Sequence, residues 1–213
     1  MVNGMRNIYV ALTVMLLLVS GPVRSFAAAR EDPALAVAML QKAIDTRDMA
    51  LAETYLDLDA VVKKAVDVAV ADESVLREAG KDPATAIVIA LGSASGANDS
   101  MREMFASEAK EYVRHGVVSG AFAGRVVEGA SVYRGIFGKA FRGGEKDKKS
   151  FGPVRVIRRG KNEARLATSL VSGTKGKAYP LELALENKTG AWRIVEIVNM
   201  PALIRQSMSK GKK

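Results

Sequence analysis

The hydrophobic pattern changes its period near the middle of the chain, and this change limits the possible folds more than any other feature. Apolar residues between about residue 32 and residue 124 recur every three or four positions, which is typical of helices. Between about residue 151 and residue 200 they alternate with polar residues, which is typical of strands. We therefore expect an α+β fold. N-terminal helices should pack on a four-stranded antiparallel meander sheet, with a C-terminal helix at the end.

Capping residues mark the starts of the expected helices. Aspartates precede apolar helical stripes at Asp32, Asp48, Asp57 and Asp82. The stripe after Asp82 covers residues 84–91 and is apolar on all sides, which predicts a buried helix. Ser100 and Glu103 have the spacing of a capping box, so a long helix is expected to begin at Ser100.

Four strand-like runs follow in the second half of the chain. They cover about residues 154–159, 164–171, 178–186 and 191–198. Turns rich in glycine and asparagine separate these runs, and short links between sequential strands favour an antiparallel meander. Met200 and Pro201 then open the expected closing helix.

The first residues of the chain have the three parts of a secretory signal peptide. Arg6 precedes the apolar run of residues 8–19, and alanines at positions 27–29 offer a cleavage site. A transmembrane anchor is the alternative, but this run is shorter than the roughly 20 residues that span a bilayer. We expect residues 1–29 to be removed. Residues 30–213 should then form a single domain that works in the periplasm or outside the cell.

Composition narrows the possible chemistry and partners. The chain contains no cysteine, which excludes disulfides, thiolate metal sites and a cysteine nucleophile. The formal net charge is +9. A basic exported protein is attracted to anionic lipids or cell-wall polymers, with lysine-rich segments at residues 146–149 and 210–213 as contacts. Basic residues are not interleaved with aromatic ones, so nucleic acid is not expected as a partner. The sequence indicates neither a cofactor nor a metal site.

Three short stretches resemble a known protein family. They are Ala43 to Asp48 (AIDTRD), Tyr55 to Asp57 (YLD) and Trp192 to Val198 (WRIVEIV). They are similar to the first helices and the last strand of a family of exported bacterial proteins of unknown function. The chain also resembles NTF2-like α+β cones and, more loosely, periplasmic phospholipid-shuttle proteins. The resemblance implies a curved sheet that wraps a long helix and encloses a pocket, and it supplies no catalytic residues.

The favoured function is a non-catalytic envelope protein that binds a small apolar or amphipathic ligand between sheet and helices. The expected pocket lining is Phe105, Tyr112, Phe122, Leu166, Leu181, Leu183, Trp192 and Ile194. The alternative for each of these residues is that it fills the core. A basic module that holds an anionic membrane or cell-wall polymer is the second function, and a hydrolase or isomerase is the third. The oligomeric state follows from none of these patterns.

Each candidate catalytic group also has an explanation as a residue that stabilises the fold. His115 is the only histidine, so a Ser-His-Asp triad would depend on it. Its position near a helix end instead suits a positive charge that faces the helix dipole. Four aspartates could supply paired carboxylates for acid–base chemistry, although some of them are expected caps. These are Asp45, Asp48, Asp57 and Asp59.

Basic and acidic side chains are expected to share one face of the sheet. The set comprises Arg155, Arg159, Arg165 and Arg193 with Glu182 and Glu186. Mixed charge on a wet sheet face predicts cross-strand pairs, and an anion site is the alternative.

Three glycines recur at a strict four-residue spacing: Gly116, Gly120 and Gly124. If they continue the stripe of the preceding helix, they form a groove that lets another helix, a backbone or an acyl chain approach closely. If the helix ends near Gly116, the glycines beyond it lie in a loop. The sequence leaves both alternatives open.

Overall fold

The computed structural model of the chain describes residues 32–71, 98–130, 133, 135, 148–172, 177–188 and 190–203. The expected signal peptide, the expected helix over residues 84–91 and the lysine-rich segment 210–213 lie outside the described residues. Within these ranges the fold is α+β, as the change of period predicted: helices fill the first half and an antiparallel sheet fills the second.

Three short helices begin within two residues of the aspartates that were expected to cap them, and Asp48 and Asp57 act as caps. The helices are α3 (Ala34–Thr46), α4 (Met49–Tyr55) and α5 (Leu58–Ala71). The Asp48 carboxylate accepts from the Leu51 amide at 2.9 Å, and the Asp57 carboxylate accepts from the Ala60 amide at 3.1 Å. Each carboxylate thus satisfies an amide that the first turn leaves without a partner.

The long helix α8 (Asn98–Val118) begins before the predicted capping box. Ser100 and Glu103 therefore lie inside its first turns, and the expectation that Ser100 caps the helix is wrong. Asp99 stands in the first turn, where a negative charge is stabilised by the helix dipole. The N-terminus of α8 therefore has an acidic first turn and does not have the predicted Ser-x-x-Glu capping box.

The sheet is antiparallel throughout and has one strand more than expected. Its strands are β1 (Lys149–Phe151), β2 (Arg155–Arg159), β3 (Glu163–Ser172), β4 (Lys177–Lys188) and β5 (Ala191–Ile197). Strands β3, β4 and β5 form the predicted meander, while β1 and β2 both pair with β3. The same edge of the sheet is thus built from two short strands with residues 152–154 between them. Residues 200–203 form a final helical turn.

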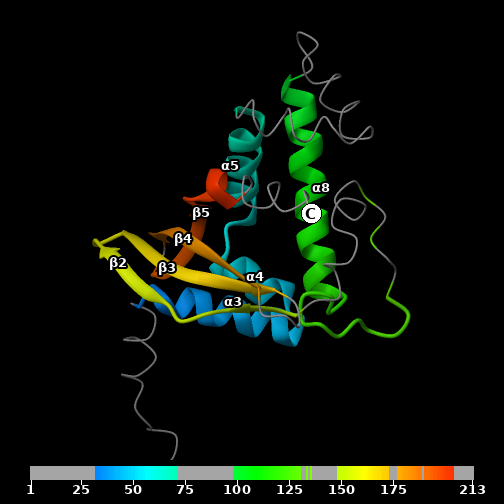
Figure 1. Ribbon diagram of the computed structural model, residues 1–213, viewed down its shortest axis with the longest axis horizontal. Helices are drawn as coiled ribbons and strands as arrows, with labels where there is room; N and C mark the ends of the chain where they lie inside the picture. Colours follow the sequence, from blue (N-terminus) through cyan, green and yellow to red (C-terminus); the bar gives the residue numbers. More distant parts are fainter. Residues whose placement is uncertain are drawn as a thin grey trace, which may run out of the picture.

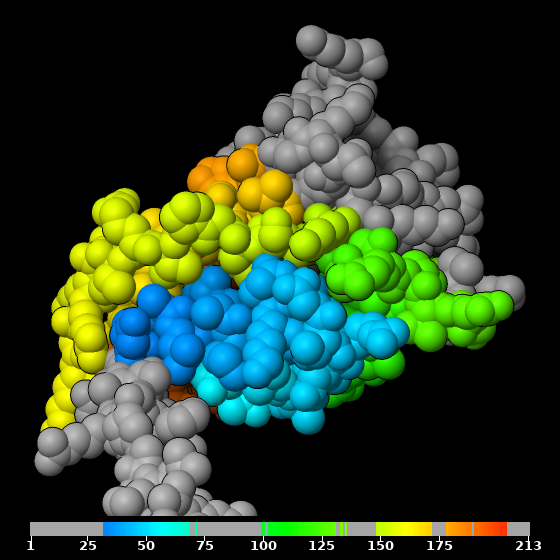
Figure 2. Space-filling model, turned by 90° about the horizontal axis from the view of Figure 1, so that it is seen from below, coloured from blue at the N-terminus to red at the C-terminus, as the bar shows by residue number. Residues whose placement is uncertain are grey.

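The elements form a curved sheet over one pair of helices, with a second pair at its side. Figure 1 shows α3 and α4 beneath the sheet, while α5 and α8 lie side by side, and α5 also packs on β5. Strands β1 to β3 arch over α3 (Figure 2). The β2–β3 hairpin projects away from the helices (Figure 1).

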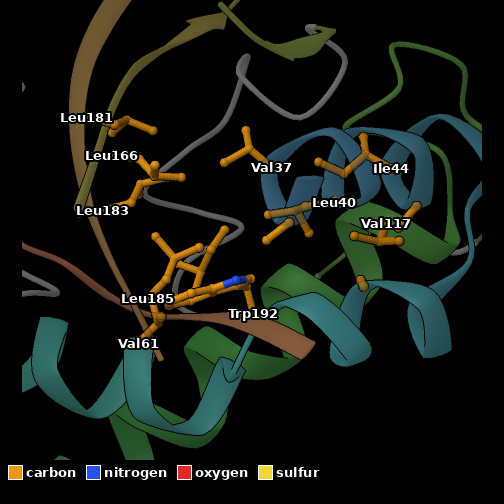
Figure 3. Packing of buried hydrophobic residues seen from close by; sticks show 14 of the residues in the cluster. Val37, Leu40, Ile44, Val61, Val117, Leu166, Leu181, Leu183, Leu185 and Trp192 are labelled. Atoms are coloured by element: carbon orange, nitrogen blue, oxygen red, sulfur yellow. The ribbon is translucent and has the colours of Figure 1, made fainter. Parts of the chain in front are cut away.

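The core lies between α3 and the concave face of the sheet. Helix α3 presents Val37 and Leu40 toward strand residues such as Leu166 and Leu183, while Ile44 lies nearer to Val117 (Figure 3). Buried alanines at positions 36 and 43 let the helix approach the sheet closely. Strand residues two apart share a face, so the period-two pattern predicted this concave side correctly.

The β5 edge of the sheet is closed by the segment that joins α4 to α5. The Asp57 amide donates to the Ile194 carbonyl at 2.9 Å, and Leu56 makes an isolated bridge with the same residue. From β5, the Arg193 guanidinium donates to the carbonyl oxygens of Glu53 and Leu56 at 3.1 and 3.4 Å. It also lies 3.6 Å from the Asp57 carboxylate. One side chain therefore joins the end of α4 to the start of α5.

Candidate functional site

The expected pocket residues fall into two groups in the structure. The strand residues Leu166, Leu181, Leu183, Trp192 and Ile194 are between 0 and 8% exposed and belong to one core cluster. The helix α8 residue Tyr112 lies instead edge-on to Phe122, with ring centroids 5.7 Å apart, and Phe105 is half-buried on the same helix. The sheet half of the expected lining is thus part of the same core as Trp192.

His115 lies in an aromatic cluster at the end of α8. Its ring centroid is 5.6 Å from that of Tyr133, which also packs edge-on against Tyr112. The Tyr133 hydroxyl donates to the Glu108 carboxylate at 2.8 Å. Burial and then this hydrogen bond raise the pKa of Tyr133 above its usual value, so the phenol stays protonated. The cluster ties residue 133 to the helix.

The three glycines do not share a helix face, because α8 ends at Val118. Gly116 is helical, whereas Gly120 and Gly124 have φ angles of +77° and +71°. The loop alternative therefore describes the last two, where a side chain would strain the backbone. A Cβ at Gly116 would overlap the ring of Phe122. The space beside this glycine is therefore filled by an aromatic side chain of the same chain.

The four candidate aspartates have different positions and roles. Asp48 and Asp57 cap helices, as expected. Asp59 forms an ion pair with Lys110 at 2.8 Å, and this hydrogen bond lowers the pKa of its carboxyl. A carboxyl with a lowered pKa is a poor general acid. Asp45 is exposed on α3.

The outward sheet face carries one ion pair between neighbouring strands and one further pair of opposite charges in register. Arg165 lies 3.1 Å from Glu182 on β4, and Arg193 faces Glu186 in the register of β4 and β5. Arg159 was expected on this face and is not there. A bulge between Val156 and Arg158 shifts the alternation, so Arg159 pairs with the buried Ala164 and points to the helix side of the sheet.

Strand β2 forms the open edge of the sheet. All five of its residues are exposed, and their sequence is RVIRR. We define the β2 edge as Arg155–Arg159 together with Lys161 in the following turn, which is also exposed. The edge carries four basic side chains and no acidic one.

The centre of the β2 edge is apolar. Val156 is 42% exposed and Ile157 is 45% exposed, with arginines on both sides of the pair. Arg158 stands directly opposite Arg165 on β3, and cross-strand pairs of like charge are destabilising. Within the residues that the structure describes, no carboxylate pairs with Arg155 or Arg158. In this part of the chain, the charges of Arg155 and Arg158 are therefore not neutralised by an acidic side chain.

A pocket of about 190 Å³ lies where the start of α3, the end of α4 and the β4–β5 turn meet. It is lined by Asp32, Leu35, Ala36, Thr54, Tyr55, Gly190, Ala191 and Trp192. Of these residues only Trp192 was in the expected lining. Asp32 was expected only to cap a helix, and no sequence pattern predicts that it lies close to Tyr55 and Trp192.

Among the helices in the described ranges, none is long and apolar enough to cross a bilayer. The same ranges hold no group of three or more histidine, aspartate or glutamate side chains able to bind a metal ion. No protein-family model, curated protein or solved structure matches the chain.

Proposed function

We propose that the protein works outside the cytoplasm and associates peripherally with an anionic membrane through the β2 edge. The observation that carries this proposal is the composition of that edge: Val156 and Ile157 are exposed between Arg155 and Arg158, which have no acidic partner among the described residues. Basic side chains are attracted to anionic head groups, and exposed apolar side chains gain from entering the interface. The signal-peptide pattern of residues 1–29 supports the location.

The strength of such an association follows from the charges of the edge. Each basic side chain near an anionic surface contributes about 1 kcal/mol. The four basic side chains of the β2 edge would then contribute on the order of 4 kcal/mol, which corresponds to a dissociation constant near 1 mM. Burial of Val156 and Ile157 would add to this value. The association is therefore expected to be weak and reversible, and salt should weaken it further.

Protection against aggregation is the alternative explanation for this edge. Natural sheets protect their edges with bulges and charged residues, and β2 has both. That role does not need two exposed β-branched apolar residues at the centre of the strand. The apolar pair also favours a lipid surface over a cell-wall polymer, because a polymer provides no apolar phase.

Vesicle binding tests the proposal. Arg155, Arg158 and Arg159 are replaced together by Gln, and a control protein carries Lys42→Gln, Lys63→Gln and Arg125→Gln. The control residues are exposed basic residues on other elements, so both proteins lose the same net charge. We expect the β2 variant to bind phosphatidylglycerol vesicles at least tenfold more weakly than the control. A Val156→Ser, Ile157→Ser variant should also bind more weakly while keeping its dependence on salt.

All proteins in this test must share the same N-terminus, because residues 8–19 are apolar and would bind lipid themselves. Mass spectrometry of the purified chains checks this. Equal binding of the β2 variant and its control would refute the proposal, as would equal binding to phosphatidylglycerol and phosphatidylcholine vesicles. Retention on an anionic polysaccharide without binding to vesicles would point to a polymer instead and would also refute it.

Small-ligand binding between helices and sheet is a second proposal. The pocket beside Tyr55 and Trp192 favours it, because it is a hollow with aromatic and aliphatic walls at the boundary between these layers. Its volume is below the roughly 300 Å³ that is usual for small-molecule pockets, so the ligand or ligand group must be small.

A further inference from the structure

We propose that the pocket between α3, α4 and the β4–β5 turn binds a small organic ammonium ion. This inference rests on the second proposed function, ligand binding, and names the class of ligand. It is independent of membrane association, because the pocket shares no residue with the β2 edge.

The charge of the lining points to a cation. Asp32 is the only lining residue that carries a charge at neutral pH, and no lysine, arginine or histidine lines the pocket. Its Oδ1 accepts from the Ala34 amide at 3.0 Å, and no basic side chain of the described residues pairs with it. Asp32 therefore gives the pocket a negative charge in a chain whose net charge is +9.

The walls of the pocket favour an organic cation over a metal ion. Tyr55 and Trp192 both line it, and aromatic faces attract ammonium groups through their quadrupoles. Recognition of methylated ammonium groups by aromatic walls is the usual functional form of this interaction. Calcium and magnesium ions prefer several oxygen ligands, whereas the only carboxylate here is that of Asp32. Leu35 and Ala36 would contact the methyl groups of the ligand.

The geometry also limits the size of the ligand. A volume of about 190 Å³ admits a group of only a few heavy atoms, such as a trimethylammonium group. The pocket opens where three separate elements meet, so a longer ligand could extend outward from it. The ammonium could therefore be a free small molecule or the head group of a choline lipid, and both sources share the same chemistry.

Tryptophan fluorescence provides a direct readout, because Trp192 is the only tryptophan of the chain and lines the pocket. The full chain is titrated with choline and separately with 3,3-dimethyl-1-butanol, which has the same shape and no charge. We expect choline to change the Trp192 emission with a dissociation constant in the millimolar range, and the neutral compound to bind at least tenfold more weakly. Phosphorylcholine, the soluble lipid head group, is titrated in parallel to distinguish the two sources.

Asp32→Asn removes the charge and keeps an oxygen that can accept from the Ala34 amide, so the start of α3 should persist. This variant should bind choline about tenfold more weakly. Asp45→Asn, an exposed carboxylate on the same helix, is the charge-matched control and should bind as the parent does. Tyr55→Phe should also bind choline as the parent does, whereas Tyr55→Leu should lose binding.

The outcomes separate failure of this inference from failure of the second proposed function. Equal affinity for choline and its neutral analogue, or no effect of Asp32→Asn, would overturn the ammonium inference and leave a pocket for neutral apolar ligands. If neither compound changes the Trp192 emission at tens of millimolar, both this inference and ligand binding at this pocket fail.

Discussion

The two edges of the sheet differ in how their backbone and side chains are covered. At the β5 edge, the Leu56–Asp57 segment pairs with Ile194, and Arg193 holds the ends of two helices. At the opposite edge, β2 is exposed along its whole length. Even β1, on the same side as β2, is covered by α3, because the Gln41 side chain accepts from the Phe151 amide at 2.8 Å.

This difference separates residues that stabilise the fold from residues that are available for binding. An edge strand presents unpaired backbone groups, so folded proteins usually cover or protect it. In the part of the chain that the structure describes, β5 and β1 are covered by other segments, whereas β2 is open. The arginines of β2 and Arg193 of β5 therefore have different roles. Substitutions at the two edges should reveal this difference.

The largest loss of stability is expected at Trp192, on the covered strand β5. Its side chain is 3% exposed and lies among Leu185, Val61 and α3 (Figure 3). Trp192→Ala should lower the free energy of unfolding by about 3–5 kcal/mol, because it removes buried area and leaves a cavity. Urea denaturation followed by far-UV circular dichroism measures this, since the variant has no tryptophan. A loss below about 1 kcal/mol would mean that the ring lies at the surface.

A smaller loss of stability is expected at Gly116, where the ring of Phe122 packs against helix α8. A Cβ there would overlap the ring of Phe122, which packs on Tyr112 and has limited freedom to move. Gly116→Ala should cost about 1–3 kcal/mol, although alanine is the better helix former. With Phe122→Ala in the background, the same substitution should be neutral or stabilising. A stabilising effect in the parent protein would show that Phe122 does not cover this glycine.

At the covered edge itself, Arg193→Met should lower the free energy of unfolding by about 1–2 kcal/mol. The methionine keeps the apolar stem and loses the hydrogen bonds to the Glu53 and Leu56 carbonyls, and charged hydrogen bonds contribute this much. Arg165→Met is the matched control on the same sheet face. Its partner is the exposed Glu182, so its cost should stay within about 0.5 kcal/mol. Equal costs for the two variants would show that Arg193 does not hold the edge.

Local sequence patterns predicted most of the fold because the helices and the meander follow local rules. The helical stripe of α3, the caps Asp48 and Asp57 and the alternation of β4 are all properties of neighbouring residues. Strand β1 was missed for the opposite reason. It has three residues, and what positions it is a side chain far away in the sequence, Gln41.

The candidate sites were less predictable, because they depend on contacts between distant segments. The position of Arg159 follows from a bulge, and a period-two rule does not foresee an extra residue in a strand. The pocket brings Asp32, Tyr55 and Trp192 together from two helices and the sheet. A signal for the β2 edge was present in the sequence, as arginines flanking Val156 and Ile157, but only the sheet order identified it as an open edge.

The smallest effect is expected at the open edge. Replacement of Arg158 with Gln removes a charge that faces Arg165 across the strands and has no acidic partner among the described residues. The free energy of unfolding should therefore stay within about 0.5 kcal/mol of the parent value and shift, if at all, toward greater stability. Ile157→Gln should also be neutral, because its side chain is already 45% exposed and little apolar area is lost from the core.

Urea denaturation followed by Trp192 fluorescence measures both of these variants, since two strands of the sheet separate β5, which carries Trp192, from β2. A loss above about 1 kcal/mol for either one would show that β2 stabilises the sheet and would remove the contrast between its two edges. Neutral stability together with weakened vesicle binding is the combination that assigns Arg158 and Ile157 to binding. Replacing a residue that fills the core destabilises the protein, whereas replacing a residue that contacts a partner weakens only the binding.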